Sequence, residues 1–323
     1  MTATGSDASR SDASPQTLGS GSLNMDGAMT EGYVEVPGGQ VWYAIAGADA
    51  PGIPLLSLHG GPGIPHDYLE PLADLADERP VIFYDQLGCG RSAGPDDPAL
   101  WTMDRAVQEV AAVRAALSLD RMHLFGNSWG GWLAMEYLLR DPEPPASVII
   151  SSATASVAEW IEDAAQLRSE LPAEQRAVLD EHEQGGWLGC PEYVAVIAAY
   201  YQRHVCRARP WPACVEQAFA GMNAVIYEAM WGVSEFGPVT GVLRDFDVRG
   251  RLGQIAVPAL VTAGRYDEAR PDRMRAVADE LQQAELAIFE NSSHMAFVEE
   301  RAAYVERVRG FLRRQDATLP ASA

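Results

Sequence analysis

Short apolar runs alternate with amphipathic segments along most of the chain. Six runs have the length and the β-branched or aromatic content of buried strands: 55–58, 81–84, 122–125, 147–150, 258–264 and 286–289. Upstream, polar and apolar residues alternate on both sides of Gly38-Gly39, as in a β-hairpin. Helical periodicity appears at 103–117, 130–139, 273–282 and 297–312. This order predicts an α/β protein with a mostly parallel, eight-stranded sheet that helices cover on both faces.

The alternation stops between residues 157 and 247, where the pattern is helical and rich in tryptophan. We expect this segment to form a helical lid over the carboxyl edge of the sheet, where open α/β sheets bind their ligands. The core would then comprise residues 30–156 and 248–315, with tails at 1–29 and 316–323. The first tail is rich in Ser, Ala, Asp and Gly, a composition typical of disordered segments.

Charge and cysteine content exclude several classes of function. The net charge of −21 argues against nucleic-acid binding and disfavours anionic membranes. Four cysteines are too few for a disulfide framework and are not spaced as zinc ligands, although three of them lie close enough in sequence to leave a single bridge open. The N-terminus lacks the features of a secretory signal. We therefore expect a soluble, cytoplasmic protein with no cofactor and no metal site, and the oligomeric state stays open.

Residues 126–130 read GNSWG and match the G-x-S-x-G pattern of a nucleophile elbow. The pattern requires a strand that turns directly into a helix, and the surrounding periodicity predicts this context. Ser128 would stand at the end of the strand, beside a helix N-terminus that favours negative charge. Ser128 is therefore the candidate nucleophile.

A serine nucleophile needs a base, and the base needs an acid that orients it. In elbow-containing folds the order along the chain is Ser, Asp or Glu, and then His. Asp267 follows the strand that ends at Gly264, and His294 follows the last strand. Asp272 is a rival acid, but its place in a Pro-Asp helix start is explained by capping. The predicted triad is Ser128, Asp267 and His294.

The tetrahedral intermediate needs two backbone N–H donors. One is expected from Trp129, which follows the nucleophile, and the other from the loop HGGPG at 59–63. Within that loop we select Gly61, because a residue without Cβ lets the backbone approach the substrate oxygen. His59 precedes the glycines and is expected to support the loop.

Taken together, the motifs resemble those of the proline iminopeptidase family of α/β-hydrolases. The resemblance rests on HGGPG at 59–63 with HDYL at 66–69, YDQLGCGRS at 84–92, GNSWGG at 126–131, RHVC at 203–206, PWP at 210–212, GRYDE at 264–268 and SSHM at 292–295. It implies a serine exopeptidase that removes one N-terminal residue, often proline, from small peptides or amides. It also implies that two glutamates hold the free amine of the substrate, and the matching positions are Glu235 and Glu268.

The chain departs from the family pattern just before Glu235. The family usually has Asn or Gln and then Gly-Pro, where this chain has Trp231-Gly-Val233. The preference for proline therefore stays open, and Trp231 is a candidate pocket residue. The resemblance also implies that some relatives strip an aminoacyl group from a precursor in antibiotic biosynthesis. A lid rich in tryptophan suits a bulky apolar leaving group, and equally an ordinary lid core.

Two other functions are compatible with parts of the pattern. An esterase or acyltransferase could use the same triad, but an uncharged ester does not need the paired carboxylates of Glu235 and Glu268. A catalytically silent binding protein would not need the complete triad and the glycine loop. Epoxide hydrolases and dehalogenases usually need an aspartate nucleophile, against which Ser128 argues.

Overall fold

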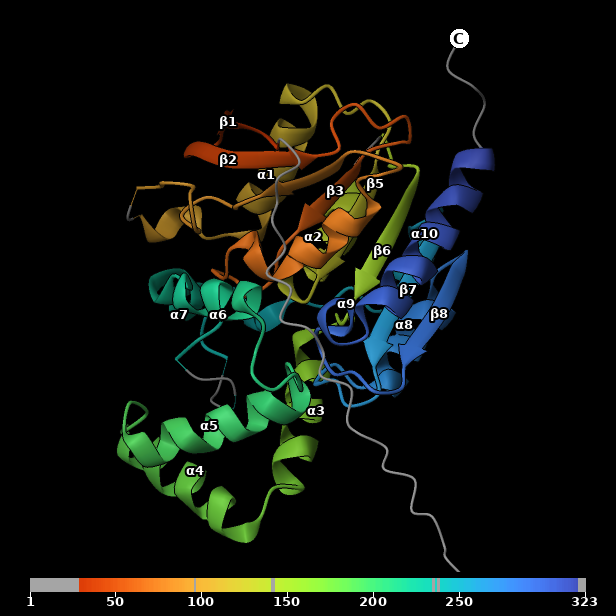
Figure 1. Cartoon of the computed structure of the whole chain (residues 1–323). Helices are drawn as coiled ribbons and strands as arrows, with labels where there is room; N and C mark the ends of the chain where they lie inside the picture. Colours follow the sequence, from red (N-terminus) through yellow and green to blue (C-terminus); the bar gives the residue numbers. More distant parts are fainter. Residues whose placement is uncertain (1–28, 96, 141–142, 234–235, 237–238, 319–323) are drawn as a thin grey trace, which may run out of the picture.

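The computed structural model describes residues 29–95, 97–140, 143–233, 236 and 239–318 (Figure 1). Residues 1–28, most of the predicted N-terminal tail, lie outside this range. Among the described residues, the helices are too short or too polar for any of them to cross a bilayer. All four cysteines are free, so the single bridge that the sequence left open does not form.

The described strands form one eight-stranded sheet in the order β1-β2-β4-β3-β5-β6-β7-β8. The strands are β1 Thr30–Val36, β2 Gly39–Ala46, β3 Leu55–Leu58, β4 Val81–Tyr84, β5 His123–Asn127, β6 Ser147–Ser151, β7 Ala259–Gly264 and β8 Ala284–Phe289. β2 pairs antiparallel with β1 and β4, and the remaining neighbours pair in parallel. The predicted hairpin and mostly parallel sheet are thus confirmed.

Alternate residues of the strands enter two hydrophobic cores, because successive side chains point to opposite faces of a sheet. Leu56 and Ile82 pack on the face covered by helices α1 Met103–Ala116, α2 Trp129–Arg140 and α8 Pro271–Glu280. Leu55 and Phe83 pack on the other face, under the 3-10 helix η1 His66–Leu75 and the helices α9 Ala296–Glu299 and α10 Arg301–Thr318. Burial on both faces explains why these strands are apolar throughout rather than alternating.

Between β6 and β7 the chain makes a helical insert, residues 157–247. Its described elements are α3 Val157–Ser169, α4 Ala173–Gly185, α5 Pro191–His204, α6 Ala213–Ala220, α7 Ala224–Met230 and the 3-10 turn η3 Val242–Asp245. An isolated bridge between Ser156 and Asp247 joins the two ends of the insert. Figure 1 shows α6 and α7 near the sheet and the α4–α5 pair farther from it. That pair has a small core of its own, built on Leu179 and Tyr193.

The C-terminal helix runs further than the sequence predicts. We expected a tail from residue 316, but α10 continues to Thr318, while residues 319–323 lie outside the described part. The reason is Asp316, whose carboxylate accepts hydrogen bonds of 3.0 Å from Arg79 Nη2 and from His123 Nε2. Burial alone would raise the pKa of Asp316, but these two donors outweigh it and lower the pKa. A buried guanidinium needs such a partner, and Arg79 is only 1% exposed.

Candidate active site

Ser128 occupies the turn between β5 and α2 in a left-handed backbone conformation, with φ of +57°. The turn is crowded, since a Cβ on Gly126 would lie 2.2 Å from Gly130 O and one on Gly130 would lie 2.1 Å from Leu58 O. Only glycine fits at these two positions. The conformation of Ser128 is of the strained kind that is found at functional sites, and it matches the geometry expected of the elbow.

Asp267 and His294 lie in loops that follow β7 and β8, at the carboxyl edge of the sheet. His294 Nδ1 donates a hydrogen bond of 2.8 Å to Asp267 Oδ1, and both residues are at most 4% exposed. The Ala269 N–H also donates to Oδ1, at 2.9 Å. A buried carboxylate with this many donors stays in place and fixes the orientation of the imidazole ring. Asp272, the rival acid, is exposed in the first turn of α8 and lies 3.5 Å from Arg270.

Ser152 is a site residue that the sequence analysis missed. Its hydroxyl donates a hydrogen bond of 2.6 Å to Asp267 Oδ2, the oxygen that His294 does not use. Its backbone is left-handed, with φ of +56°, and its N–H donates to Thr262 O at 2.8 Å. The available signal was its place directly after β6, at the same edge of the sheet as the predicted triad.

Tyr68 connects the glycine loop to the elbow. Its hydroxyl accepts a hydrogen bond of 2.6 Å from the Gly60 N–H and donates one of 2.9 Å to Asn127 Oδ1. Gly60 precedes the predicted donor Gly61, and Asn127 precedes Ser128. The two segments are in close contact, since a Cβ on Gly60 would lie 3.0 Å from the Cβ of Ser128. Sequence reasoning missed this link, although Tyr68 and Asn127 both stand inside motifs that it used.

A second connection runs through Gln86 and confirms that His59 supports the loop. The Gln86 N–H donates to His59 Nε2 at 2.8 Å, and Gln86 Oε1 accepts from Trp129 Nε1 at 2.8 Å. Burial lowers the pKa of His59 to about 4. His59 is therefore uncharged at neutral pH, where its Nε2 lone pair can accept the Gln86 N–H.

A cavity of about 750 Å³, including its open mouth, lies where the sheet core meets the insert. Five predicted site residues of the core line it: Gly61, Ser128, Trp129, Glu268 and His294. Most of the remaining lining is apolar or aromatic: Ile64, Tyr68, Trp132, Trp160, Tyr201, Val205, Phe219, Met222, Tyr227, Trp231 and Met295. The chemistry-bearing groups thus come from the sheet edge, while α3, α5, α6 and α7 supply much of the apolar wall.

Of the two predicted amine anchors, only Glu268 lies within the described residues. Glu268 lines the cavity, is 7% exposed and places Oε1 3.8 Å from His294 Nδ1. Glu235 lies outside the described residues. Trp231, the candidate pocket residue, also lines the cavity. Its ring packs 6.0 Å from that of Trp132 and 6.2 Å from that of Trp160, so it belongs to the aromatic wall and to the packing behind it.

Comparison with known proteins agrees with this architecture. Residues 53–301 match the model of the alpha/beta hydrolase fold family. The chain is 39% identical to a proline iminopeptidase of Heyndrickxia coagulans over 88% of this chain and 98% of the relative. It is 36% identical to one of Saccharolobus solfataricus over 87% and 92%, respectively.

Two solved structures are similar over nearly their whole length. One is the proline iminopeptidase of Mycobacterium smegmatis, with 37% identity, a TM-score of 0.83 and coverage of 90% of this chain and 99% of that one. The other is VinJ, with 33% identity, a TM-score of 0.85 and coverage of 88% and 99%. The chain therefore belongs to the proline iminopeptidase family of α/β-hydrolases.

Proposed function

We propose that this enzyme hydrolyses the amide bond after a single N-terminal aminoacyl residue that carries a free amine. The observation that carries the proposal is one cavity lined by a serine in an elbow, a histidine bonded to a buried aspartate, and the carboxylate of Glu268. The first three groups supply acyl transfer, and the fourth supplies a charge that selects an ammonium group.

The reaction would proceed through an acyl-enzyme. His294 Nε2 takes the proton of Ser128 as its oxygen attacks the scissile carbonyl, and Asp267 stabilises the imidazolium through Nδ1. The N–H groups of Gly61 and Trp129 hold the oxyanion. His294 then protonates the departing amine. His294 next removes a proton from a water molecule, which attacks the ester of the acyl-enzyme. This step releases the amino acid and restores Ser128.

Recognition of the amine follows from distance and charge. The α-ammonium lies two bonds from the scissile carbonyl, so its anchor must stand next to the catalytic groups. Glu268 adjoins Asp267 in sequence and lies at the same cavity as Ser128. A carboxylate that is only 7% exposed gains most when a cation reaches it, because water screens it little. Glu235 would be the second anchor, as the family resemblance implies.

The leaving amine would be apolar and could be large. The wall of aromatic and aliphatic side chains offers apolar contact, and Glu268 is the only Asp, Glu, Lys or Arg among the described lining residues. A small peptide or an aminoacylated biosynthetic intermediate would both satisfy this description.

The test compares aminoacyl-naphthylamides with free and with N-acetylated amines. Acetylation removes the charge and leaves Glu268 without its cation, so kcat/KM should fall at least about a hundredfold, roughly 2.7 kcal/mol. Glu268→Gln and Glu235→Gln should each lower kcat/KM for the free-amine substrate and hardly change kcat/KM for the acetylated one. A double-mutant cycle between enzyme and substrate measures this coupling directly.

A matched control is Glu290→Gln, because Glu290 is a solvent-exposed carboxylate that pairs with Arg265 outside the cavity. It should leave both substrates unaffected. Equal cleavage of the free and acetylated substrates would contradict the aminopeptidase assignment. Activity on neutral esters would then favour an esterase or acyltransferase that uses the same triad.

A further inference from the structure

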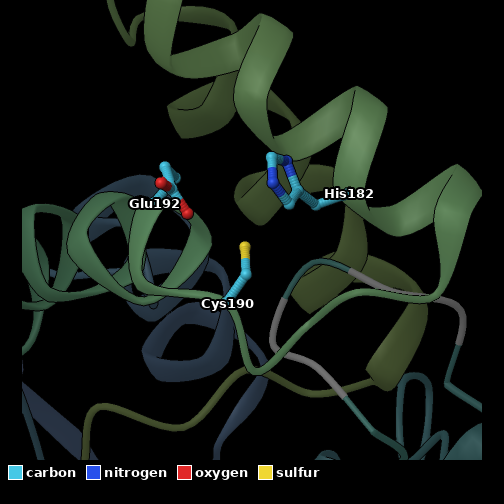
Figure 2. Close-up of side chains that lie close together, drawn as sticks. All are labelled: His182, Cys190 and Glu192. Carbon is cyan, nitrogen blue, oxygen red and sulfur yellow. The ribbon is translucent and has the colours of Figure 1, made fainter.

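Three side chains with metal-binding atoms meet at the outer end of the insert, far from the motifs discussed above. His182 lies in the last turn of α4, Cys190 precedes the first residue of α5, and Glu192 lies in the first turn of α5. Figure 2 shows the three side chains pointing toward a common space. One ligand atom from each, a ring nitrogen, the thiol sulfur and a carboxylate oxygen, lies within 4.8 Å of the other two.

The ring of His182 is oriented as in many metal sites. Its Nδ1 lies 2.8 Å from the carbonyl oxygen of Val178, one turn earlier on α4. A carbonyl can only accept, so Nδ1 carries the proton and Nε2 carries the lone pair. A hydrogen bond from the second ring nitrogen to a carbonyl is the usual way in which a protein fixes a metal-binding histidine.

Cys190 holds its sulfur at the N-terminus of α5. It is the N-cap residue of α5, and its sulfur accepts a hydrogen bond of 3.4 Å from the Tyr193 N–H. This hydrogen bond fixes the sulfur at the start of the helix, and cysteine sulfur is among the ligand atoms that zinc prefers. Cys190 as a whole is half-buried.

We propose that His182, Cys190 and Glu192 bind a divalent ion of the zinc class. Sulfur, imidazole nitrogen and carboxylate oxygen together are typical zinc ligands, whereas calcium and magnesium prefer oxygen alone. Tetrahedral zinc, with bonds of about 2.0–2.3 Å, needs ligand atoms about 3.3–3.6 Å apart. Because all three atoms lie within 4.8 Å of one another, no pair must close by more than about 1.5 Å, and the exposed Glu192 side chain is free to rotate toward the other two ligands. A water molecule would complete the coordination.

Binding would tie the end of α4 to the start of α5. The Cys190 thiol would lose its proton to solvent as the metal–sulfur bond forms, so affinity would rise with pH. Gly185 ends α4, the intervening turn contains Gly186 and Gly189, and the pair of helices shares only a small core. A cross-link there would restrict the motion of α4 and α5 relative to one another.

Cobalt(II) provides the decisive probe, because its bond to a thiolate gives a charge-transfer absorption band that oxygen or nitrogen ligands do not give. The full-length, reduced protein is titrated with cobalt(II) alone and then with zinc(II), which should displace it. One equivalent should give the band. Cys190→Ser should abolish it, while His182→Gln and Glu192→Gln should each weaken zinc(II) binding at least about tenfold.

The matched control is Cys214→Ser, which removes a half-buried thiol from α6 and should leave the band intact. Cys190→Ser should remain folded, since serine is itself a favoured N-cap residue. Zinc(II) should also slow amide hydrogen exchange in residues 173–204 of the wild type but not of Cys190→Ser. No band in the wild type, or a band that survives Cys190→Ser, would overturn the proposal.

Discussion

The sheet core and the insert hold their cavity residues by different means. In the core, polar groups are fixed by hydrogen bonds: Asp267 accepts from His294, Ser152 and the Ala269 N–H, and Tyr68 joins two loops. In the insert, the lining consists mostly of rings and aliphatic chains. The outer helices share a small core, and Trp187 in the turn between them and Val194 on α5 are each more than half exposed. The difference suggests that the core determines reactivity and the insert determines which molecules reach it.

Removing the nucleophile should have the largest effect and should act on the core alone. Ser128→Ala should lower kcat by about 10⁴ to 10⁶, the usual loss for a triad serine, and leave the melting temperature nearly unchanged. Turnover of a free-amine aminoacyl-naphthylamide measures the loss. A serine-directed phosphonate should label the wild type at Ser128, as seen by mass spectrometry. More than about a tenth of the wild-type activity in the variant would remove Ser128 from the mechanism.

Loosening the link between the glycine loop and the elbow should have the second largest effect. Tyr68→Phe deletes the hydroxyl that bonds Gly60 and Asn127, so the Gly61 and Trp129 donors should lose their relative alignment. We expect kcat to fall about ten- to a hundredfold with little change in KM, because small displacements of catalytic groups are costly.

Affinity for an aminoacyl boronate, which mimics the tetrahedral intermediate, should fall in parallel with kcat. Tyr84→Phe is the matched control, since it removes a buried hydroxyl that has no hydrogen-bond partner in the described structure. An increase in KM with unchanged kcat would show that Tyr68 contacts substrate rather than positioning the loop.

A substitution in the insert should have the smallest effect on activity. It should change the preference among substrates rather than the reactivity of Ser128. Trp231 is only 4% exposed, so Trp231→Ala would leave a cavity and lower the free energy of unfolding by about 3–5 kcal/mol. A change in substrate preference could then not be separated from a loss of stability. Trp231→Phe keeps most of the packing. It should change the ranking of leaving amines by about tenfold in kcat/KM, while phosphonate labelling of Ser128 proceeds at the wild-type rate. Equal losses on all amines, with slower labelling, would assign Trp231 to the catalytic centre.

What could be predicted from the sequence was carried by short, local signals. The apolar runs of the strands, the elbow around Ser128 and the positions of Asp267 and His294 after successive strands are each readable within a few residues. Because Ser128, Asp267 and His294 each follow a strand, they were expected at the carboxyl edge of the sheet. The position of the cavity could therefore be predicted as well.

What could not be predicted depends on residues far apart in sequence. The bond from Ser152 to Asp267 spans 115 residues, and that from Tyr68 to Asn127 spans 59. A serine or tyrosine that makes such a bond resembles any other until the fold is known. The extension of α10 was missed for the same reason, because Asp316 acquires its role only from Arg79 and His123. The burial of Trp231 likewise depends on rings from α2 and α3.

The bond between His123 and Asp316 also bears on how the chain is made. The two residues are 193 positions apart, and the whole insert is synthesised between them. At typical translation rates of 5–20 residues per second, the interval is roughly 10–40 s. During that time the strand that precedes the elbow lacks the carboxylate that its histidine and the buried Arg79 will share. Arg79 and His123 would therefore lack the carboxylate of Asp316 until α10 has been synthesised and has packed on the sheet. Chaperones could act on the nascent chain during this period.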